Sequence, residues 1–408
     1  MDPAQAIFEG ASLASTFPIL AASFRSLSLF LLAFTYAPGN ISSISFIDRT
    51  NTTFGPHQYI ALNARRDRAY TTSWGSPPIL SSWEIVREQQ IEHWRVSHIN
   101  NAPITATSSY IDLPPPCCDF VYSMGGPTGE VHELEPATGG FGKKVQEVLF
   151  VDGKELEAAD KTRKALREGS HGIEFLSSST PRLAFVPVLG TSAKPGTIEV
   201  YVQVATTGRL AHLHSTPSPP ISESNDGPRH VKIHPNGRVL YCVTEHTNRI
   251  DVYTIDPTSK TPLTYVASQA LMLPSPPGKH YRGSTLRLAP STPKYPAPRA
   301  ILTSTRGGSE ETKGWIGIHP LGADGSFAGA PQYHELPTSG GKSLALAVMS
   351  KPRDDDRSWV LVSDDAEDGG GVRVLEWDHD TNALEGLAFW GGEAGVKMEG
   401  SSFSLWLD

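Results

Sequence analysis

Two arginines, a histidine and a glutamate stand at the edges of short apolar segments, at corresponding places in a repeated pattern. His171 precedes one such segment, and Arg229 stands at the start of the next. Glu245 follows the second segment of its repeat, and Arg306 stands at the same place one repeat later. Arginine binds carboxylates through its planar fork, and histidine exchanges protons near neutral pH. Together these residues could bind a polyanionic acid and transfer a proton to it.

Each of these residues taken alone would ordinarily be a surface side chain in a turn, so their recurrence in successive repeats is the argument for a shared site. No competing motif is found: the chain lacks a P-loop, an H-E-x-x-H zinc motif, a dinucleotide fingerprint and an EF-hand loop. Gly340-Gly-Lys-Ser lacks the upstream glycine of a phosphate loop. The acidic runs 354–356 and 364–368 are interpreted as solvated turns. We therefore expect no metal and no cofactor.

The segments that must position these residues are short, rich in β-branched and aromatic residues, and bounded by Gly, Pro, Asn or Asp, which is typical of strands. They recur in four copies with a period of about 55 to 60 residues, within the range of propeller blades. A lone four-stranded blade cannot bury both of its faces, so blades must stack on one another, and a ring leaves no exposed end. The pattern predicts an all-β propeller. The regular period disfavours the rival, one or more β-sandwiches. The four copies begin at His171, His230, Ser284 and Ser343, with an earlier one at Ile60.

The ends of the chain are expected to close this ring. Residues 28–34 are predicted to form the first strand, and residues 402–407 to pair within the same blade, so that N- and C-terminal strands join. Residues 1–25 are expected to be a poorly structured extension, and residues 26–408 a single propeller domain. The only helical pattern spans 153–168 and is expected to cap or connect blades.

Composition excludes several classes of function. The 408 residues include 35 Lys and Arg against 43 Asp and Glu, a net charge of −8, so a basic face for nucleic acid is not expected. The apolar stretch 26–34 is far shorter than the roughly 20 residues of a membrane span. The three cysteines, Cys117, Cys118 and Cys242, show no CxxC spacing and are expected to be reduced. These features favour a cytoplasmic protein that contacts neither nucleic acid nor membrane.

Five stretches carry a resemblance to a known family: HGIEF (171–175), GPRHVKIHPNGRVLYCVTEHTNRIDVYTIDP (227–257), YRGSTLRLAP (281–290), LTSTRG (302–307) and PTSGGKS (337–343). They resemble the fungal 3-carboxy-cis,cis-muconate lactonizing enzyme (carboxy-cis,cis-muconate cyclase), of the lactonase-type seven-bladed propeller group. The sequence H-P-N-G-x-x-L-Y is typical of the whole group, whereas P-R-H with T-E-H-x-N-R and S-T-R-G is narrower and points to the cyclase. This chain has Lys342-Ser-Leu where the family tends to have His-Ser-Asn, and Gly-Ser rather than Ala-Asp after Arg282.

The resemblance implies seven blades and cycloisomerisation of 3-carboxy-cis,cis-muconate to a carboxymuconolactone, a step of aromatic catabolism in the β-ketoadipate pathway. It implies a small polycarboxylate as partner, and the chain could also form a homo-oligomer. His171 would be the general acid, and Glu245 would orient or charge it, or position an arginine. The residues expected to bind the carboxylates are Arg229 and Arg306, with Arg282 and Lys342 as helpers.

Two other functions fit the same residues. A lactonase or 6-phosphogluconolactonase-like hydrolase could bind phosphate through these arginines and activate water through His171. A non-catalytic propeller could bind a partner through its rim, and the altered residues 342–344 leave room for that function.

Overall fold

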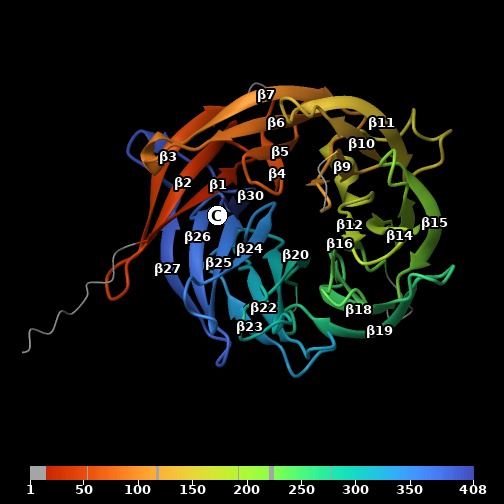
Figure 1. The fold of residues 1–408 in the computed structure, drawn as a ribbon. Coiled ribbons are helices and arrows are strands. Elements are labelled where there is room, and N and C mark those ends of the chain that lie inside the picture. Colours follow the sequence, from red (N-terminus) through yellow and green to blue (C-terminus); the bar gives the residue numbers. More distant parts are fainter. Residues whose placement is uncertain (1–14, 53, 116–118, 192, 220–224, 277) are drawn as a thin grey trace, which may run out of the picture.

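The chain folds into a ring of blades around a central axis (Figure 1). The computed structural model describes residues 15–52, 54–115, 119–191, 193–219, 225–276 and 278–408. Within these ranges, the strands form seven four-stranded antiparallel sheets and one two-stranded hairpin. The predicted seven-bladed β-propeller is therefore confirmed.

Each blade runs from an inner strand at the axis to an outer strand at the rim. The first blade consists of β30 (Phe403–Trp406), β1 (Ser15–Ala22), β2 (Ser28–Tyr36) and β3 (Ser43–Asn51). The second to fourth blades are, from inner to outer strand, β4 (His57–Leu62), β5 (Arg68–Ser73), β6 (Ile79–Val86) and β7 (Arg95–Pro103); β8 (Tyr110–Asp112), β9 (Phe120–Gly125), β10 (Thr128–Leu134) and β11 (Phe141–Leu149); β12 (Glu174–Leu176), β13 (Leu183–Gly190), β14 (Pro195–Gln203) and β15 (Leu210–Pro217).

The remaining blades follow the same order, and the small hairpin lies after the seventh. The fifth to seventh blades and the hairpin are β16 (Pro228–Ile233), β17 (Val239–Thr244), β18 (Arg249–Ile255) and β19 (Leu263–Ala270); β20 (Tyr281–Leu288), β21 (Ala300–Gly307), β22 (Trp315–Pro320) and β23 (Gln332–Glu335); β24 (Leu344–Ser350), β25 (Arg357–Asp364), β26 (Gly371–Asp378) and β27 (Leu384–Trp390); β28 (Gly392–Glu393) and β29 (Val396–Lys397).

The ring closes through segments from opposite ends of the sequence, as predicted. Strand β1 pairs with β30, Ile19 opposite Trp406, and on its other edge with β2. The expected boundary of the N-terminal extension is wrong, because residues 15–22 form a buried strand of the first blade. The strand expected to be first, at 28–34, is the third from the axis of that blade. Residues 1–14 lie outside the described residues.

The helical prediction for residues 153–168 is also wrong. This connection consists of turns and a short 3-10 helix, η2 (Arg163–Arg167), capped by the Thr162 hydroxyl. Leu166 is the one residue of η2 that is buried. A helix here would have no continuous apolar face to bury, and packing of such a face supplies most helical stability in proteins. Another 3-10 turn, η1 (Ile91–His93), precedes β7.

The hydrophobic core lies between neighbouring blades, because each sheet buries both of its faces against the next. Between the seventh and first blades, Trp359 packs edge-on against Phe34, with ring centroids 5.1 Å apart. Equivalent clusters fill the space between the fourth and fifth blades and between the sixth and seventh. In the part of the chain that the structure describes, no helix is long and apolar enough to cross a bilayer.

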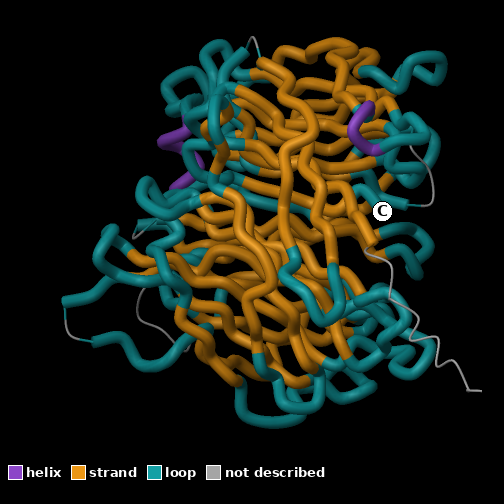
Figure 2. Tube along the Cα trace, turned by 90° about the vertical axis from the view of Figure 1, so that its left-hand side faces the viewer, coloured by secondary structure: helices purple, strands orange, loops and turns teal. Residues whose placement is uncertain are grey.

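The ring has two faces, each covered by loops (Figure 2). On one face, every inner strand begins and every second strand ends, because neighbouring strands within a blade are antiparallel. We call the end of the central channel at this face the site mouth, and the other end the opposite mouth. His171 and Lys342 precede an inner strand, and Arg229 and Arg282 stand near the start of one. Glu245 and Arg306 stand at or just after the end of a second strand. The fold therefore brings all six candidate residues to the site mouth.

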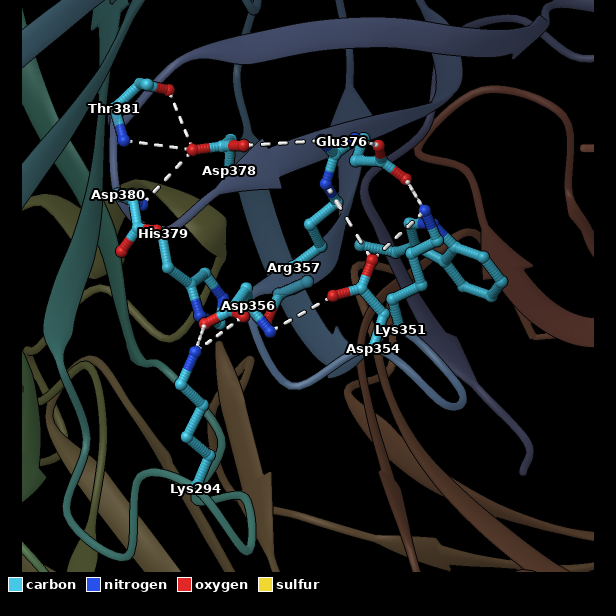
Figure 3. Close-up of polar contacts among 12 residues, drawn as sticks. Lys294, Lys351, Asp354, Asp356, Arg357, Glu376, Asp378, His379, Asp380 and Thr381 are labelled. Atoms are coloured by element: carbon cyan, nitrogen blue, oxygen red, sulfur yellow. Dashed lines mark hydrogen bonds and ion pairs between the residues drawn. The ribbon is translucent and has the colours of Figure 1, made fainter. Parts of the chain in front are cut away.

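The acidic runs are more structured than expected. Asp356 accepts hydrogen bonds from Lys294 and Tyr295 and so fastens the 291–298 connection to the seventh blade (Figure 3). Beside it, Glu376 pairs with Lys351 at 2.9 Å and with Arg357 at 2.6 Å. The second run is not a solvated turn at its start, since Asp364 and Asp365 are buried. No group of residues suited to a metal ion occurs within the described ranges.

Candidate functional site

Three arginines from two neighbouring blades converge on one buried carboxylate at the site mouth. Arg229 donates from Nε to Oε2 of Glu245 at 2.9 Å. Arg282 and Arg306 both donate to the other oxygen, Oε1, at 3.0 and 3.2 Å. Glu245 and Arg229 are buried, whereas the Arg282 side chain is 46% exposed. We call these four residues the arginine cluster.

A β-bulge directs Arg229 into this cluster. In β16, Pro228 pairs with Thr244 and His230 with Val243, so Arg229 is an extra residue without an opposite partner. Strand β20 has a bulge at the equivalent position, where Ser284 is the extra residue. Bulges re-aim side chains and are common beside active sites. Here the second bulge also places the Ser284 carbonyl where it accepts a hydrogen bond from the Arg229 guanidinium.

The backbone of Glu245 is fixed from both sides. Its N–H donates to the Gly227 carbonyl at 2.7 Å, and its carbonyl accepts from the Gly283 N–H at 3.1 Å. A Cβ atom on Gly283 would stand 2.2 Å from the Thr244 carbonyl oxygen, so only glycine allows β20 to approach this closely. The second of these bonds joins the fifth and sixth blades at the carboxylate that their arginines share.

The charges of the cluster stabilise one another. Burial alone would raise the pKa of Glu245, but Arg306 and Arg229 outweigh it and lower that pKa to about 2. Burial lowers the pKa of Arg229 to about 10, despite the neighbouring carboxylate. At neutral pH the cluster therefore consists of three cations and one anion. Its surplus of two positive charges makes it an anion-binding surface.

His171 lies beside the cluster and is neutral in the unliganded protein. Burial, followed by the charge of Arg229, lowers the pKa of its imidazole well below the ordinary value. The ring packs against His230, with centroids 5.2 Å apart, and its buried Nδ1 has no hydrogen-bond partner within the described residues. A buried, unpaired ring nitrogen next to surplus positive charge is suited to contact a bound anion.

The two predicted helpers differ in what they contribute. Arg282 joins the cluster through its guanidinium. Lys342 contributes its carbonyl, which accepts from Arg306 at 2.7 Å, whereas its side chain is exposed. Glu245 contacts arginines, and no hydrogen bond between it and His171 occurs in the described part of the chain. Of the roles left open for Glu245, the positioning of arginines has the geometric support.

Sequence reasoning missed several residues at this mouth. His230 follows Arg229 directly and receives a hydrogen bond from its guanidinium at 3.2 Å; the Pro-Arg-His motif contained it, but only the arginine was singled out. Across the ring, just beyond the end of β5, Trp74 stacks on Phe24 with centroids 3.9 Å apart. Arg25 pairs with the buried Asp365 at 3.2 Å. The residues from the first blade were missed because that segment was expected to be unstructured.

Known proteins resemble both the fold and parts of the sequence. Residues 144–307, which include most of the site, match the family described as "Lactonase, 7-bladed beta-propeller". Muconate cycloisomerase 1 of Cutaneotrichosporon cutaneum is 25% identical over 373 residues, covering 90% of this chain and 92% of that protein. Carboxy-cis,cis-muconate cyclase of Neurospora crassa is 32% identical over 162 residues, covering 38% of this chain and 41% of that protein.

Solved structures share the architecture at much lower identity. The periplasmic gluconolactonase of Pseudomonas aeruginosa superimposes with a TM-score of 0.68 at 15% identity, covering 97% of this chain and 99% of that one. At such identity the likeness establishes the fold alone. The chain is thus a seven-bladed β-propeller whose residues 144–307 resemble the lactonase-type propeller family, and its sequence is similar to two proteins named for muconate cyclisation.

Proposed function

We propose that the protein is a cycloisomerase that converts 3-carboxy-cis,cis-muconate to a carboxymuconolactone. The observation that carries the proposal is the arginine cluster, in which three guanidinium groups share one carboxylate and leave two positive charges for a ligand. A substrate with several carboxylates matches that surplus. The similarity to two proteins named for muconate cyclisation supports the same reaction.

The reaction requires a folded substrate and one proton. A carboxylate oxygen of the substrate forms a C–O bond to one carbon of a conjugated double bond, and the π electrons move to the neighbouring carbon as an enolate. That carbon then accepts a proton, so the trianionic substrate and one proton give a dianionic lactone. Arginines hold the carboxylates in the cyclising geometry and stabilise the developing charge. Each such donor lowers the activation free energy by about 3 to 4 kcal/mol.

His171 is the proposed proton donor, and it must first gain a proton. Its imidazole is neutral in the free protein because of burial and Arg229. A bound trianion offsets the positive field of the arginines and raises the pKa of His171, so that substrate and proton bind together. Glu245 is a positioning residue in this scheme, because it orients the guanidinium groups of Arg229, Arg282 and Arg306.

Lactone hydrolysis is the second candidate, and the match of residues 144–307 to the lactonase family favours it. In that reaction the cluster would bind an anionic lactone, and neutral His171 would activate water as a general base. The two reactions differ in their substrates, so parallel assays distinguish them.

The test follows the ultraviolet absorbance of the conjugated diene with 3-carboxy-cis,cis-muconate, and separately the hydrolysis of glucono-lactone and 6-phosphogluconolactone. Arg306→Ala is expected to abolish cyclisation while the far-ultraviolet circular dichroism stays unchanged. Arg299→Ala is the matched control, because Arg299 pairs with Asp380 in an exposed contact away from the cluster. Near-normal turnover of Arg306→Ala, or hydrolysis without cyclisation in the wild type, would reject the cyclase.

A further inference from the structure

The opposite mouth of the channel contains a second, separate cavity. Its volume is about 520 Å³, within the range of small-molecule pockets. Aromatic rings lie between it and the arginine cluster: Tyr59 packs against Phe403 and Tyr110 with centroids 4.1 and 4.3 Å apart, and Tyr110 against His230 at 5.3 Å. We call this space the lower cavity. The site proposed above uses none of its residues.

Charged residues line one side of the lower cavity. They come from three inner strands: Asp112 from β8, Lys232 from β16 and Arg287 from β20. Asp112 follows Tyr110 by two residues, and Lys232 follows His230 by two residues. Lys232 is already neutralised, because its Nζ bonds Glu174 at 2.5 Å. In contrast, within the described part of the chain no carboxylate lies within ion-pair distance of the Arg287 guanidinium, which donates to the Tyr59 hydroxyl at 2.8 Å.

Asp112 offsets the charge of Arg287 only in part. Burial, and then the charge of Glu174, raises the pKa of Asp112 to about 7, although Lys232 and Arg287 act in the opposite direction. The phenols of Tyr110 and Tyr59 also lie near Asp112, and Arg66 and Asp408 line the same cavity. Arg287 is therefore a half-buried cation that has no ion-pair partner among the described residues, next to an acid that can donate a hydrogen bond in its protonated form. An unpaired charge in such a place is costly unless an anion joins it.

Most of the remaining wall is apolar, although Asn63, Arg66 and Asp408 also line the cavity. Ala61, Ala347, Met349 and Leu405 line the cavity from the second, seventh and first blades. A ligand that fits both sides has one anionic group and an apolar body. This requirement differs from that of the arginine cluster, whose surplus of two charges suits a polyanion.

We propose that the lower cavity binds a small organic monocarboxylate, with the carboxylate on Arg287 and the apolar body against Ala347, Met349 and Leu405. The acid form of Asp112 donates a hydrogen bond to the same carboxylate. This binding site is independent of the reaction at the site mouth.

The test measures the binding of benzoate by isothermal titration calorimetry at pH 6. The wild type is expected to bind benzoate, and Arg287→Gln to weaken the binding at least tenfold. Arg306→Ala, which removes a cation of the arginine cluster, is the matched control and should leave benzoate binding unchanged. The proposal is overturned if the wild type does not bind benzoate at millimolar concentration, or if Arg306→Ala weakens the binding and Arg287→Gln does not.

A second variant covers the case in which Arg287→Gln does not fold. Ala347→Phe fills the apolar side of the lower cavity and leaves every charge in place. It is expected to weaken benzoate binding at least tenfold with an unchanged circular dichroism spectrum. A folded Ala347→Phe protein that binds benzoate as tightly as the wild type would overturn the proposal.

Discussion

Replacement of Glu245 by glutamine tests the electrostatic account of the arginine cluster most directly. The amide keeps the shape of the side chain but removes the anion that three guanidinium groups share. The pKa of Glu245 is about 2 instead of its ordinary 4.5. At 1.36 kcal/mol per pKa unit, the carboxylate contributes about 3 kcal/mol to stability at pH 7, the lower end of the cost of breaking a buried ion pair.

The sign of the pH dependence follows from the lowered pKa. A carboxylate with a lowered pKa stabilises the fold above its unfolded-state pKa, and that contribution is lost as pH falls from about 4.5 through about 2. Urea unfolding of wild type and Glu245→Gln should therefore differ by about 3 kcal/mol at pH 7 and by about 2 kcal/mol at pH 3.5. An equal stability of the two proteins at pH 7, or a difference that grows toward low pH, would refute the reasoning.

Activity adds a second readout and a matched control. Glu376→Gln removes a partly buried carboxylate that pairs with Lys351 and Arg357 at the far rim of the seventh blade (Figure 3). Both variants should lose stability, but only Glu245→Gln should lose turnover, by about 100-fold in kcat, because the guanidinium donors that Glu245 positions are then displaced. KM for the polycarboxylate should stay the same or fall, because the cluster gains net positive charge. Equal turnover losses in the two variants would reduce Glu245 to a structural residue.

Three further outcomes are expected. Binding of tricarballylate at pH 7 should take up close to one proton, because the lowered pKa of His171 leaves its imidazole neutral before the ligand binds. Calorimetry in buffers of different ionisation enthalpy measures this uptake, and His171→Gln should abolish it. Gly283→Ala should lower the free energy of unfolding in urea by about 1 to 3 kcal/mol, since the new Cβ would lie 2.2 Å from the Thr244 carbonyl oxygen. Gly386→Ala is the control and should leave stability nearly unchanged, because its Cβ would have no atom within 4 Å. Benzoate binding should weaken several-fold from pH 6 to pH 8.5 as Asp112 ionises through its pKa of about 7, and Asp112→Asn should remove that dependence.

The repeat pattern predicted the architecture because four consecutive blades, from β12 to β27, keep the period and contain short β-branched and aromatic segments bounded by turn residues. Two elements did not follow the pattern. Four of the eight residues of β1 are Ser, Pro or Ala, which have low strand propensity, and the strand is stabilised because β2 and β30 pair with its two edges. The third blade begins with β8, a strand of three residues, too short for a periodic signal.

The sequence predicted that the candidate residues meet at one mouth of the ring, but not how they contact one another. The positions of Arg229, Glu245, Arg282 and Arg306 follow from the strand ends, since antiparallel blades bring those ends to one face. That three guanidinium groups share a single carboxylate depends on two bulges, and no sequence pattern marks a bulge of this kind. The low pKa of His171 likewise depends on burial in the folded ring.

The pairing of β30 with β1 has a consequence for how the protein is made. The innermost strand of the first blade comes from residues 403–406, whereas its three neighbours come from residues 15–51. During translation, the blades that carry the guanidinium groups leave the ribosome well before residues 403–406 do. Until then β1 has an unpaired edge, which is prone to intermolecular association and offers a binding site for chaperones.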